Sequence, residues 1–192
     1  MFAILAEDRS DAEVLRILVR RIVGRDDLKV HKMGFGGCGE LRRKAASHIQ
    51  NFSRQGASRF IICHDSDGKD PEAVRKDVRD AIGRKIDLKR FRHAIVVPVQ
   101  ELEAWIIADE AAIAAVIPSL DIKPVSQPET IMSPKEWLTK QSRAGKSKSK
   151  PLYLYATHNA KVAPHLDVAK VQAKCPSFRL LVEFVQKAMK AG

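Results

Sequence analysis

Acidic residues stand at or just beyond the ends of three apolar runs in the sequence. They are Glu7, Asp11, Asp65, Asp67, Glu101 and Glu103. Grouped carboxylates repel one another unless a cation neutralises them, and their hard oxygen atoms suit Mg²⁺ or Mn²⁺. If the chain brings these acids together, they predict a divalent-metal site.

Asp65 and Asp67 are two residues apart, at the point where an apolar run breaks into the polar stretch Asp65-Ser66-Asp67-Gly68. Strict alternation of side chains ends with a strand, so both carboxylates can face one ion there. A metal site of this type can activate water and stabilise the leaving oxygen in phosphodiester cleavage. Asp is also common in turns for its hydrogen bonding alone, so the motif by itself leaves both interpretations open.

Apolar runs and helical patterns alternate through the first part of the chain. Strands are predicted at 2–6, 28–33, 59–64 and 93–99, and helices at 11–23, 40–52, 71–83 and 102–116. Either Ser10 or Asp11 can cap the first helix. Such alternation is typical of an α/β, Rossmann-like fold, in which a central, mostly parallel sheet of about four strands has helices on both faces. Ligands bind such sheets at the carboxyl ends of the strands, where these acids stand.

The C-terminal part of the chain differs in composition. We predict an α/β core at 1–117 and a Pro-containing, mainly helical extension at 118–192, packed on that core. From Lys135 onward there are 12 Lys and Arg against 3 Asp and Glu, in a chain whose net charge is +11. This basic extension, together with clustered carboxylates, suits a polyanion such as nucleic acid, although a solvated basic surface explains it equally well.

One short segment concentrates that charge. Lys146, Lys148 and Lys150 alternate with small residues, and Arg143 precedes them, so we predict phosphate contacts there. A second loop, at 34–39, is rich in glycine and would let a backbone approach phosphates near the start of a helix. It lacks the Gly-Lys-Ser/Thr of a P-loop and is more typical of a flexible turn.

Other features narrow the class of protein. No apolar run approaches the roughly 20 residues of a membrane-spanning helix, so we expect no membrane contact. The N-terminus has no basic region before its apolar run and is not typical of a signal peptide. Three widely spaced cysteines form neither a disulfide framework nor a zinc pattern. These features favour a cytoplasmic protein.

The strand-ending Glu7, the strand-ending Asp65-Ser66-Asp67 and the Glu101-Leu102-Glu103-Ala104-Trp105 stretch together resemble the TOPRIM domain. The resemblance is to small bacterial TOPRIM-related proteins, similar to nucleases of the overcoming-lysogenization-defect class, which are often encoded beside ATPases in phage-defence loci. One departure is that Asp8 follows Glu7, where TOPRIM proteins usually have glycine.

This resemblance implies a Mg²⁺-dependent (or Mn²⁺-dependent) nuclease that hydrolyses DNA or RNA, with Glu7, Asp65 and Asp67 as catalytic metal ligands. Glu7 can instead serve as general acid or base, and Glu101 and Glu103 would complete a second metal position. The resemblance also implies Lys161 as a cation near the scissile phosphate and an ATPase as the partner protein. A homodimer is left open.

Two alternatives remain at this stage. Asp65-Ser66-Asp67-Gly68 resembles the motif of haloacid-dehalogenase-type phosphatases, in which the first Asp is a covalent nucleophile. That motif is expected on the first strand, and here it follows the third. The other alternative is a non-catalytic regulator that keeps the fold and binds nucleic acid or protein through its basic extension.

Overall fold

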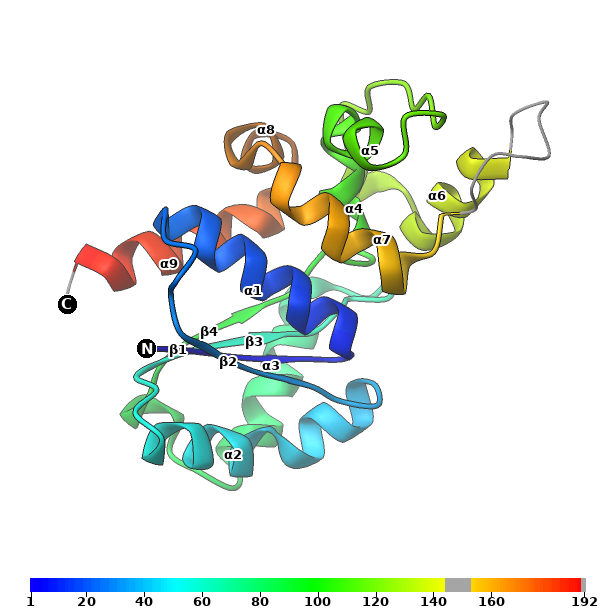
Figure 1. Cartoon of the computed structure of the whole chain (residues 1–192). Helices are drawn as coiled ribbons and strands as arrows, with labels where there is room; N and C mark the ends of the chain where they lie inside the picture. The colour runs from blue at the N-terminus through cyan, green and yellow to red at the C-terminus, as the bar shows by residue number, and fades with distance from the viewer. Residues whose placement is uncertain (144–152, 191–192) are drawn as a thin grey trace.

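The computed structural model describes residues 1–143 and 153–190, and its centre is a four-stranded parallel sheet (Figure 1). The strands lie in the order β2-β1-β3-β4, and all three neighbouring pairs are parallel. Their bounds are β1 Phe2–Ala6, β2 Val30–Gly34, β3 Arg59–Cys63 and β4 Arg92–Val96. The predicted α/β, Rossmann-like class is therefore confirmed.

The two central strands are apolar because both of their faces are covered. Phe2 and Ile4 of β1 pack into the core on one face of the sheet, and Ala3 and Leu5 pack into the core on the other. The alternation follows from the two-residue repeat of a strand. A strand buried on both faces has no polar side, which accounts for the uninterrupted apolar run at the start of the chain.

Helices from different parts of the chain cover the two faces. Helices α2 (Cys38–Arg54) and α3 (Pro71–Gly83) lie on one face, whereas α1 (Arg9–Val23) and the C-terminal helices lie on the other (Figure 1). Each helix starts from the carboxyl end of the strand before it. The first turns of α1 and α2 therefore lie beside the strand ends that carry the acids.

Helix α1 begins earlier than the sequence pattern predicts. Its N-cap is Asp8, whose side chain accepts a hydrogen bond from the backbone N–H of Asp11, and Gly24 ends it in the left-handed conformation. The predicted caps Ser10 and Asp11 are therefore wrong, since both lie inside the first turn. Any of the three can cap a helix, and the tight turn after Glu7 selects Asp8.

The helix predicted at 102–116 is two helices, α4 (Glu103–Ile107) and α5 (Glu110–Val116). Asp109 stands between them. Its carboxylate accepts hydrogen bonds from the backbone N–H of Asp167, at 2.8 Å, and from Lys170 Nζ, at 2.9 Å. These partners come from a segment some 60 residues away, so the local pattern gave no sign of the break.

The C-terminal part is mainly helical, as predicted, and packs on α1 and β4. It contains α6 Pro134–Arg143, α7 Tyr155–Val162, α8 Val168–Lys174 and α9 Pro176–Lys190, with short 3₁₀ turns at Pro128–Thr130 and Ala163–His165. A further 3₁₀ turn, Leu88–Arg90, precedes β4. Core residues from both sides of residue 117 form one hydrophobic cluster, so the hydrophobic core does not divide the chain there. The boundary at residue 117 stays a prediction.

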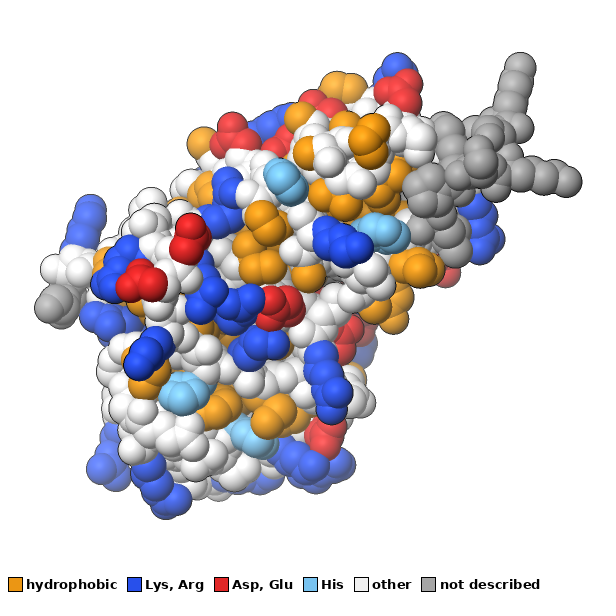
Figure 2. Space-filling model, in the orientation of Figure 1, with side chains coloured by type: hydrophobic (Ala, Val, Ile, Leu, Met, Phe, Trp, Pro, Cys, Tyr) orange, Lys and Arg blue, Asp and Glu red, His pale blue; other side chains and the backbone are white. Residues whose placement is uncertain are grey.

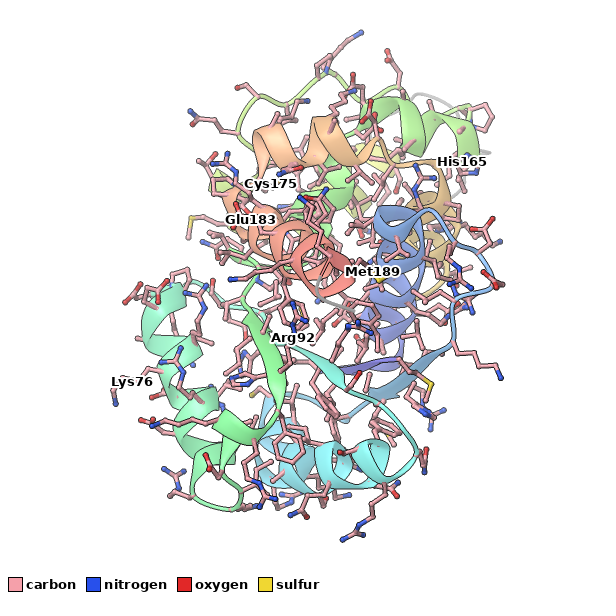
Figure 3. The ribbon with its side chains drawn as sticks, turned by 90° about the vertical axis from the view of Figure 1, so that its left-hand side faces the viewer. Lys76, Arg92, His165, Cys175, Glu183 and Met189 are labelled. Carbon is pink, nitrogen blue, oxygen red and sulfur yellow. The ribbon has the colours of Figure 1, made fainter. Side chains whose placement is uncertain are left out.

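Two arginines attach the last helix to the sheet. Arg59 of β3 and Arg92 of β4 donate hydrogen bonds to the carbonyl oxygens of Ala188 and Lys187, at 3.0 and 2.7 Å. Figure 3 shows Arg92 on β4, between α3 and α9. The terminal carbonyls of α9 lack partners within the helix, so these bonds satisfy them and fix α9 at the amino edge of the sheet.

None of the helices in the described ranges combines the length and the apolar character that crossing a membrane requires.

Candidate functional site

All the acids predicted from the sequence except Asp67 gather at the carboxyl edge of the sheet, and three of them are buried. The exposed fraction is 4% for Asp11, 5% for Asp65 and 0% for Glu103. Asp11 comes from the first turn of α1, Asp65 follows β3, and Glu103 begins α4. Buried carboxylates are costly unless they are protonated or paired with a cation, so this group needs an explanation.

Asp65 joins the ends of neighbouring strands. Its backbone N–H donates to Glu7 Oε1 at 3.0 Å, and its own Oδ1 accepts from the N–H of Leu102 at 3.1 Å. Burial raises the pKa of Asp65 well above its usual value, and the nearby charge of Asp11 raises it further. The segments after β1, β3 and β4 therefore meet at this residue.

Lys135 places a positive charge among the acids. Its Nζ lies 3.7 Å from one carboxylate oxygen of each of Asp65, Glu101 and Glu103. Its backbone N–H also donates to Glu101 Oε2 at 2.9 Å, at the beginning of α6. Burial alone would lower the pKa of Lys135, but the charges of Glu103, Asp65 and Glu101 outweigh it and raise that pKa. The ammonium therefore stays charged and partly neutralises the cluster.

Glu103 is held in place by two residues that follow the basic segment. Asn159 Nδ2 donates to Glu103 Oε1 at 2.8 Å, and the Tyr153 hydroxyl donates to Asn159 Oδ1 at 2.6 Å. Burial raises the pKa of Glu103 to about 7, although Lys135 and Asn159 act in the opposite direction. The other oxygen, Oε2, has no hydrogen-bond partner among the described residues.

Asp11, in the first turn of α1, is buried beside these acids. Burial raises its pKa to about 8, with further contributions from the charges of Asp8 and Glu103. Its Oδ1 is buried and has no hydrogen-bond partner in the described part of the chain. Two buried carboxylate oxygens, Asp11 Oδ1 and Glu103 Oε2, thus have no hydrogen bond among the described residues, and Lys135 Nζ faces the second of them at 3.7 Å.

Glu7 is oriented by a histidine that is 3% exposed. His64 Nδ1 lies 2.9 Å from Glu7 Oε1 and 2.6 Å from the carbonyl oxygen of Asp65, while Arg42 approaches His64 Nε2 at 3.1 Å. Both neighbours of Nδ1 are acceptors and Arg42 can only donate, which assigns the ring proton to Nδ1. His64 thus fixes the direction of the Glu7 carboxylate.

The glycine-rich loop lies beside Glu7. Gly37 N–H donates to the Glu7 carbonyl at 3.0 Å, and a Cβ at Gly34 would overlap the backbone of Asp8 and Arg9. Next to the loop is a polar hollow of about 420 Å³, whose lining includes Arg9, Lys44 and His48. The loop therefore borders the carboxyl edge, next to a surface with basic side chains.

Asp67 does not join the cluster. It is exposed, adopts a left-handed backbone conformation with φ of 49°, and makes no side-chain hydrogen bond or ion pair with any described residue. No contact in the described part of the chain links the side chains of Asp67 and Asp65, and that the two share one ion stays a prediction. The chain turns at Asp67, where its N–H bonds to the carbonyl of Gln100.

The predicted basic residues fall in different places. Lys161 on α7 is exposed and forms no ion pair among the described residues, and its place near a scissile phosphate stays a prediction; the lysine that lies among the acids is Lys135. Arg143 is exposed at the end of α6. Lys146, Lys148 and Lys150 lie outside the described residues.

The donor set fits a hard divalent cation in its chemistry, but the side chains are spread around an amino group. Within residues 1–143 and 153–190, no three His, Cys, Asp or Glu side chains stand close enough to hold one metal ion. The carboxylate oxygens lie 3.7 Å from Nζ, so an ion at the position of Nζ would be too far from them: Mg²⁺ requires roughly 2.0–2.1 Å. Binding would therefore need the amino group to leave and the carboxylates to close in.

Sequence reasoning missed Lys135, Asn159 and Tyr153. One signal for Lys135 was present, because Ser133-Pro134 begins a helix and puts a lysine in its first turn, where the helix dipole disfavours a cation. A lysine there needs acidic neighbours from elsewhere. Asn159 gave no local signal, since it bonds to Glu103, which is distant in sequence, and Tyr153 is linked to Glu103 only through Asn159.

No curated protein matches the chain, and no solved structure matches it. A family model does match, and it covers residues 6–186, which include every described acid of the cluster and Lys135. That model is described as a domain of unknown function, DUF4276, and the chain belongs to this family.

Proposed function

We propose that this protein is a divalent-metal-dependent nuclease that hydrolyses phosphodiester bonds of DNA or RNA. The observation that supports this most directly is the pair of buried carboxylate oxygens without donors, on Asp11 and Glu103, beside Asp65 at the carboxyl edge of a parallel sheet. Buried oxygens of this kind are normally paired. A hard cation would satisfy both, at the edge where such sheets bind ligands.

Five acids would hold the ion or ions: Asp11, Asp65, Glu103, Glu101 and Glu7. Mg²⁺ or Mn²⁺ bound there would activate water and stabilise charge on the phosphate oxygens. His64 orients Glu7, and Asn159 orients Glu103, so the chain itself fixes the direction of two carboxylates. Glu7, the less buried of these two, is placed to accept a proton from an attacking water.

Basic side chains near the cluster favour a polyanionic substrate. Helix α6 is about 15 Å long, with Lys135 in its first turn at the cluster and the exposed Arg143 at its end. The N–H of Tyr153 donates to Ser142 Oγ at 2.9 Å, so Lys135 and Tyr153 are linked through α6. Figure 2 shows further Lys and Arg side chains spread over this face, between hydrophobic and uncharged groups.

The test is cleavage of defined single- and double-stranded DNA and RNA by the purified full chain with Mg²⁺ or Mn²⁺. We expect cleavage that a chelator stops. Asp65→Asn and Glu103→Gln should lower the rate at least about 100-fold, because each removes a ligand from the cluster. Asp67→Asn and the exposed Asp121→Asn serve as controls and should stay within about threefold of the parent chain.

Other outcomes would select another function. An aspartyl-phosphate trapped at Asp65 during hydrolysis of a simple phosphomonoester would favour the haloacid-dehalogenase-type phosphatase. Tight nucleic-acid or protein binding that a chelator does not affect, without cleavage, would favour the non-catalytic regulator. Absence of cleavage with either metal, alone and with an ATPase partner, would contradict the nuclease proposal. The ATPase partner, the homodimer and the cytoplasmic location stay predictions.

A further inference from the structure

The amino group of Lys135 stands at equal distance from three acids without bonding closely to any of them. Its Nζ is 3.7 Å from oxygens of Asp65, Glu101 and Glu103. A direct ammonium–carboxylate hydrogen bond is shorter, at roughly 2.7–2.9 Å. The lysine therefore supplies charge to the whole group, as a free cation would, and has no single preferred partner.

We propose that Lys135 is a built-in counter-ion that competes with a divalent cation for this carboxylate cluster and must withdraw before the cation binds. The inference rests on the metal site of the proposed function and adds a regulation of that site. The same three carboxylates cannot close around Mg²⁺ or Mn²⁺ while the ammonium lies between them. Displacing Lys135 costs free energy, so the cluster binds the metal more weakly than it would without the lysine.

The surroundings let the side chain leave without unfolding the site. The Lys135 side chain is 27% exposed, and its Nζ lies 5.3 Å from the centre of the Tyr155 ring, which is itself 43% exposed. Outward movement along that ring keeps a cation–π contact. The backbone of Lys135 stays bonded to Glu101, and Asn159 continues to hold Glu103. The lysine side chain can therefore move out first, and the carboxylates then close in around the ion.

The experiment measures Mn²⁺ binding to the full chain by isothermal titration calorimetry at about pH 8, without nucleic acid. Lys135→Met removes the charge and keeps most of the side-chain volume. The matched control is Lys170→Met, since Lys170 also bridges two acids, Asp109 and Glu110, at 2.9 and 2.7 Å. Those acids belong to the contact between α5 and α8 and lie outside the cluster.

We expect Lys135→Met to bind Mn²⁺ at least about tenfold more tightly than the parent chain, because a competing charge close to three ligands is gone. Lys170→Met should bind like the parent. Unchanged or weaker binding by folded Lys135→Met would overturn the inference, since it would mean that the lysine organises the ligands and does not compete with the ion.

A second measurement uses the parent chain and does not depend on how well the variant folds. Lysines are labelled with an amine-reactive acetylating reagent, with and without saturating Mn²⁺, and each site is quantified by mass spectrometry. Labelling of Lys135 should rise several-fold with Mn²⁺, while labelling of Lys170 should not change. Equal labelling of Lys135 in the two conditions would overturn the inference.

The inference and the proposed function can fail separately. Tighter Mn²⁺ binding by Lys135→Met, with no cleavage of any nucleic acid, would support the counter-ion and contradict the nuclease. Metal-dependent cleavage by the parent chain, without tighter Mn²⁺ binding by Lys135→Met, would support the nuclease and contradict the counter-ion. Absence of Mn²⁺ binding in both proteins would overturn the inference and the metal site together.

Discussion

At the scale of single residues, three carboxylates are kept where water is excluded. Asp11, Asp65 and Glu103 each have a pKa raised chiefly by burial, and the charges of Asp11 and Glu103 raise the pKa of Asp65 further. Such residues add nothing to the stability of an apolar core, because each must be protonated or neutralised to stay buried. Their grouping around one lysine supports the proposal that the cluster binds a cation.

Asp11 gives a pH dependence whose sign is fixed by its pKa, raised from 3.8 to about 8. Between these values the folded chain binds a proton that the unfolded chain does not. The contribution of this group to stability is therefore complete below about pH 4 and is lost as the pH rises through 8. In chelator, Asp11→Asn should gain stability over the parent as the pH rises from 5 to 8.5, on the order of a few kcal/mol.

Urea unfolding of both proteins at several pH values measures this difference. Asp121→Asn is the control, because Asp121 is exposed and pairs only with the exposed Lys123. The free energy of unfolding of the control, relative to the parent, should not change with pH by more than about 0.5 kcal/mol. A constant difference for Asp11→Asn would mean that Asp11 is ionised in the folded chain throughout this range.

The sequence identified most of the acids of the site but not which of them converge. Glu7, Asp65, Glu101 and Glu103 were found because strand ends in a parallel sheet meet at one edge, a rule that needs only strand positions. Asp67 is exposed and has no described contact with them, because the direction of a side chain in a turn depends on φ and ψ, which sequence spacing does not give. Lys135 was missed because its partners lie more than 30 residues away.

At the scale of elements, the strands and the first three helices followed from local patterns. Their hydrophobic repeats and the proline at the start of α3 sufficed to place them to within a few residues. The break between α4 and α5 did not follow, because it depends on Asp109 bonding to Asp167 and Lys170. Local propensity predicts where an element can form, and contacts distant in sequence decide where it stops.

The glycine-rich loop provides a test of how closely the end of β2 must approach the start of α1. A Cβ at Gly34 would overlap the backbone of Asp8 and Arg9, whereas a Cβ at Gly39 would meet nothing within 4 Å. Gly34→Ala should therefore lower the free energy of unfolding by about 1–3 kcal/mol. It should also weaken Mn²⁺ binding, because Asp8 adjoins Glu7.

Gly39→Ala is the matched control, since it lies inside α2 and its backbone conformation suits alanine. We expect a gain of about 0.5–1 kcal/mol and unchanged Mn²⁺ binding. Thermal and urea unfolding measure both variants. If Gly34→Ala is as stable as the parent, the start of α1 can move away from β2, and the loop does not position Glu7.

At the scale of the whole molecule, one hydrophobic core joins the two ends of the chain. Phe178, Leu181 and Val185 of α9 are fully buried in the same cluster as Leu15 and Leu18 of α1. Arg59 and Arg92 bind the end of α9 to the sheet. The C-terminal helices thus take the place that covering helices have on one face of other doubly covered sheets.

This arrangement predicts that residues 1–117 do not fold without the rest of the chain. Removing 118–192 would expose one face of the sheet and α1, and would remove Lys135 and Asn159 from the acid cluster. We expect the fragment to show little cooperative thermal unfolding, while the full chain unfolds in one transition. Circular dichroism and the dispersion of amide resonances measure this. In the full chain, Phe178→Ala should cost about 3–5 kcal/mol, whereas Leu180→Ala, 41% exposed on the same helix, should cost less than about 1 kcal/mol. A fragment 1–117 that folds and unfolds cooperatively would show instead that the α/β part is an independent domain, to which the basic helices were added as a separate unit.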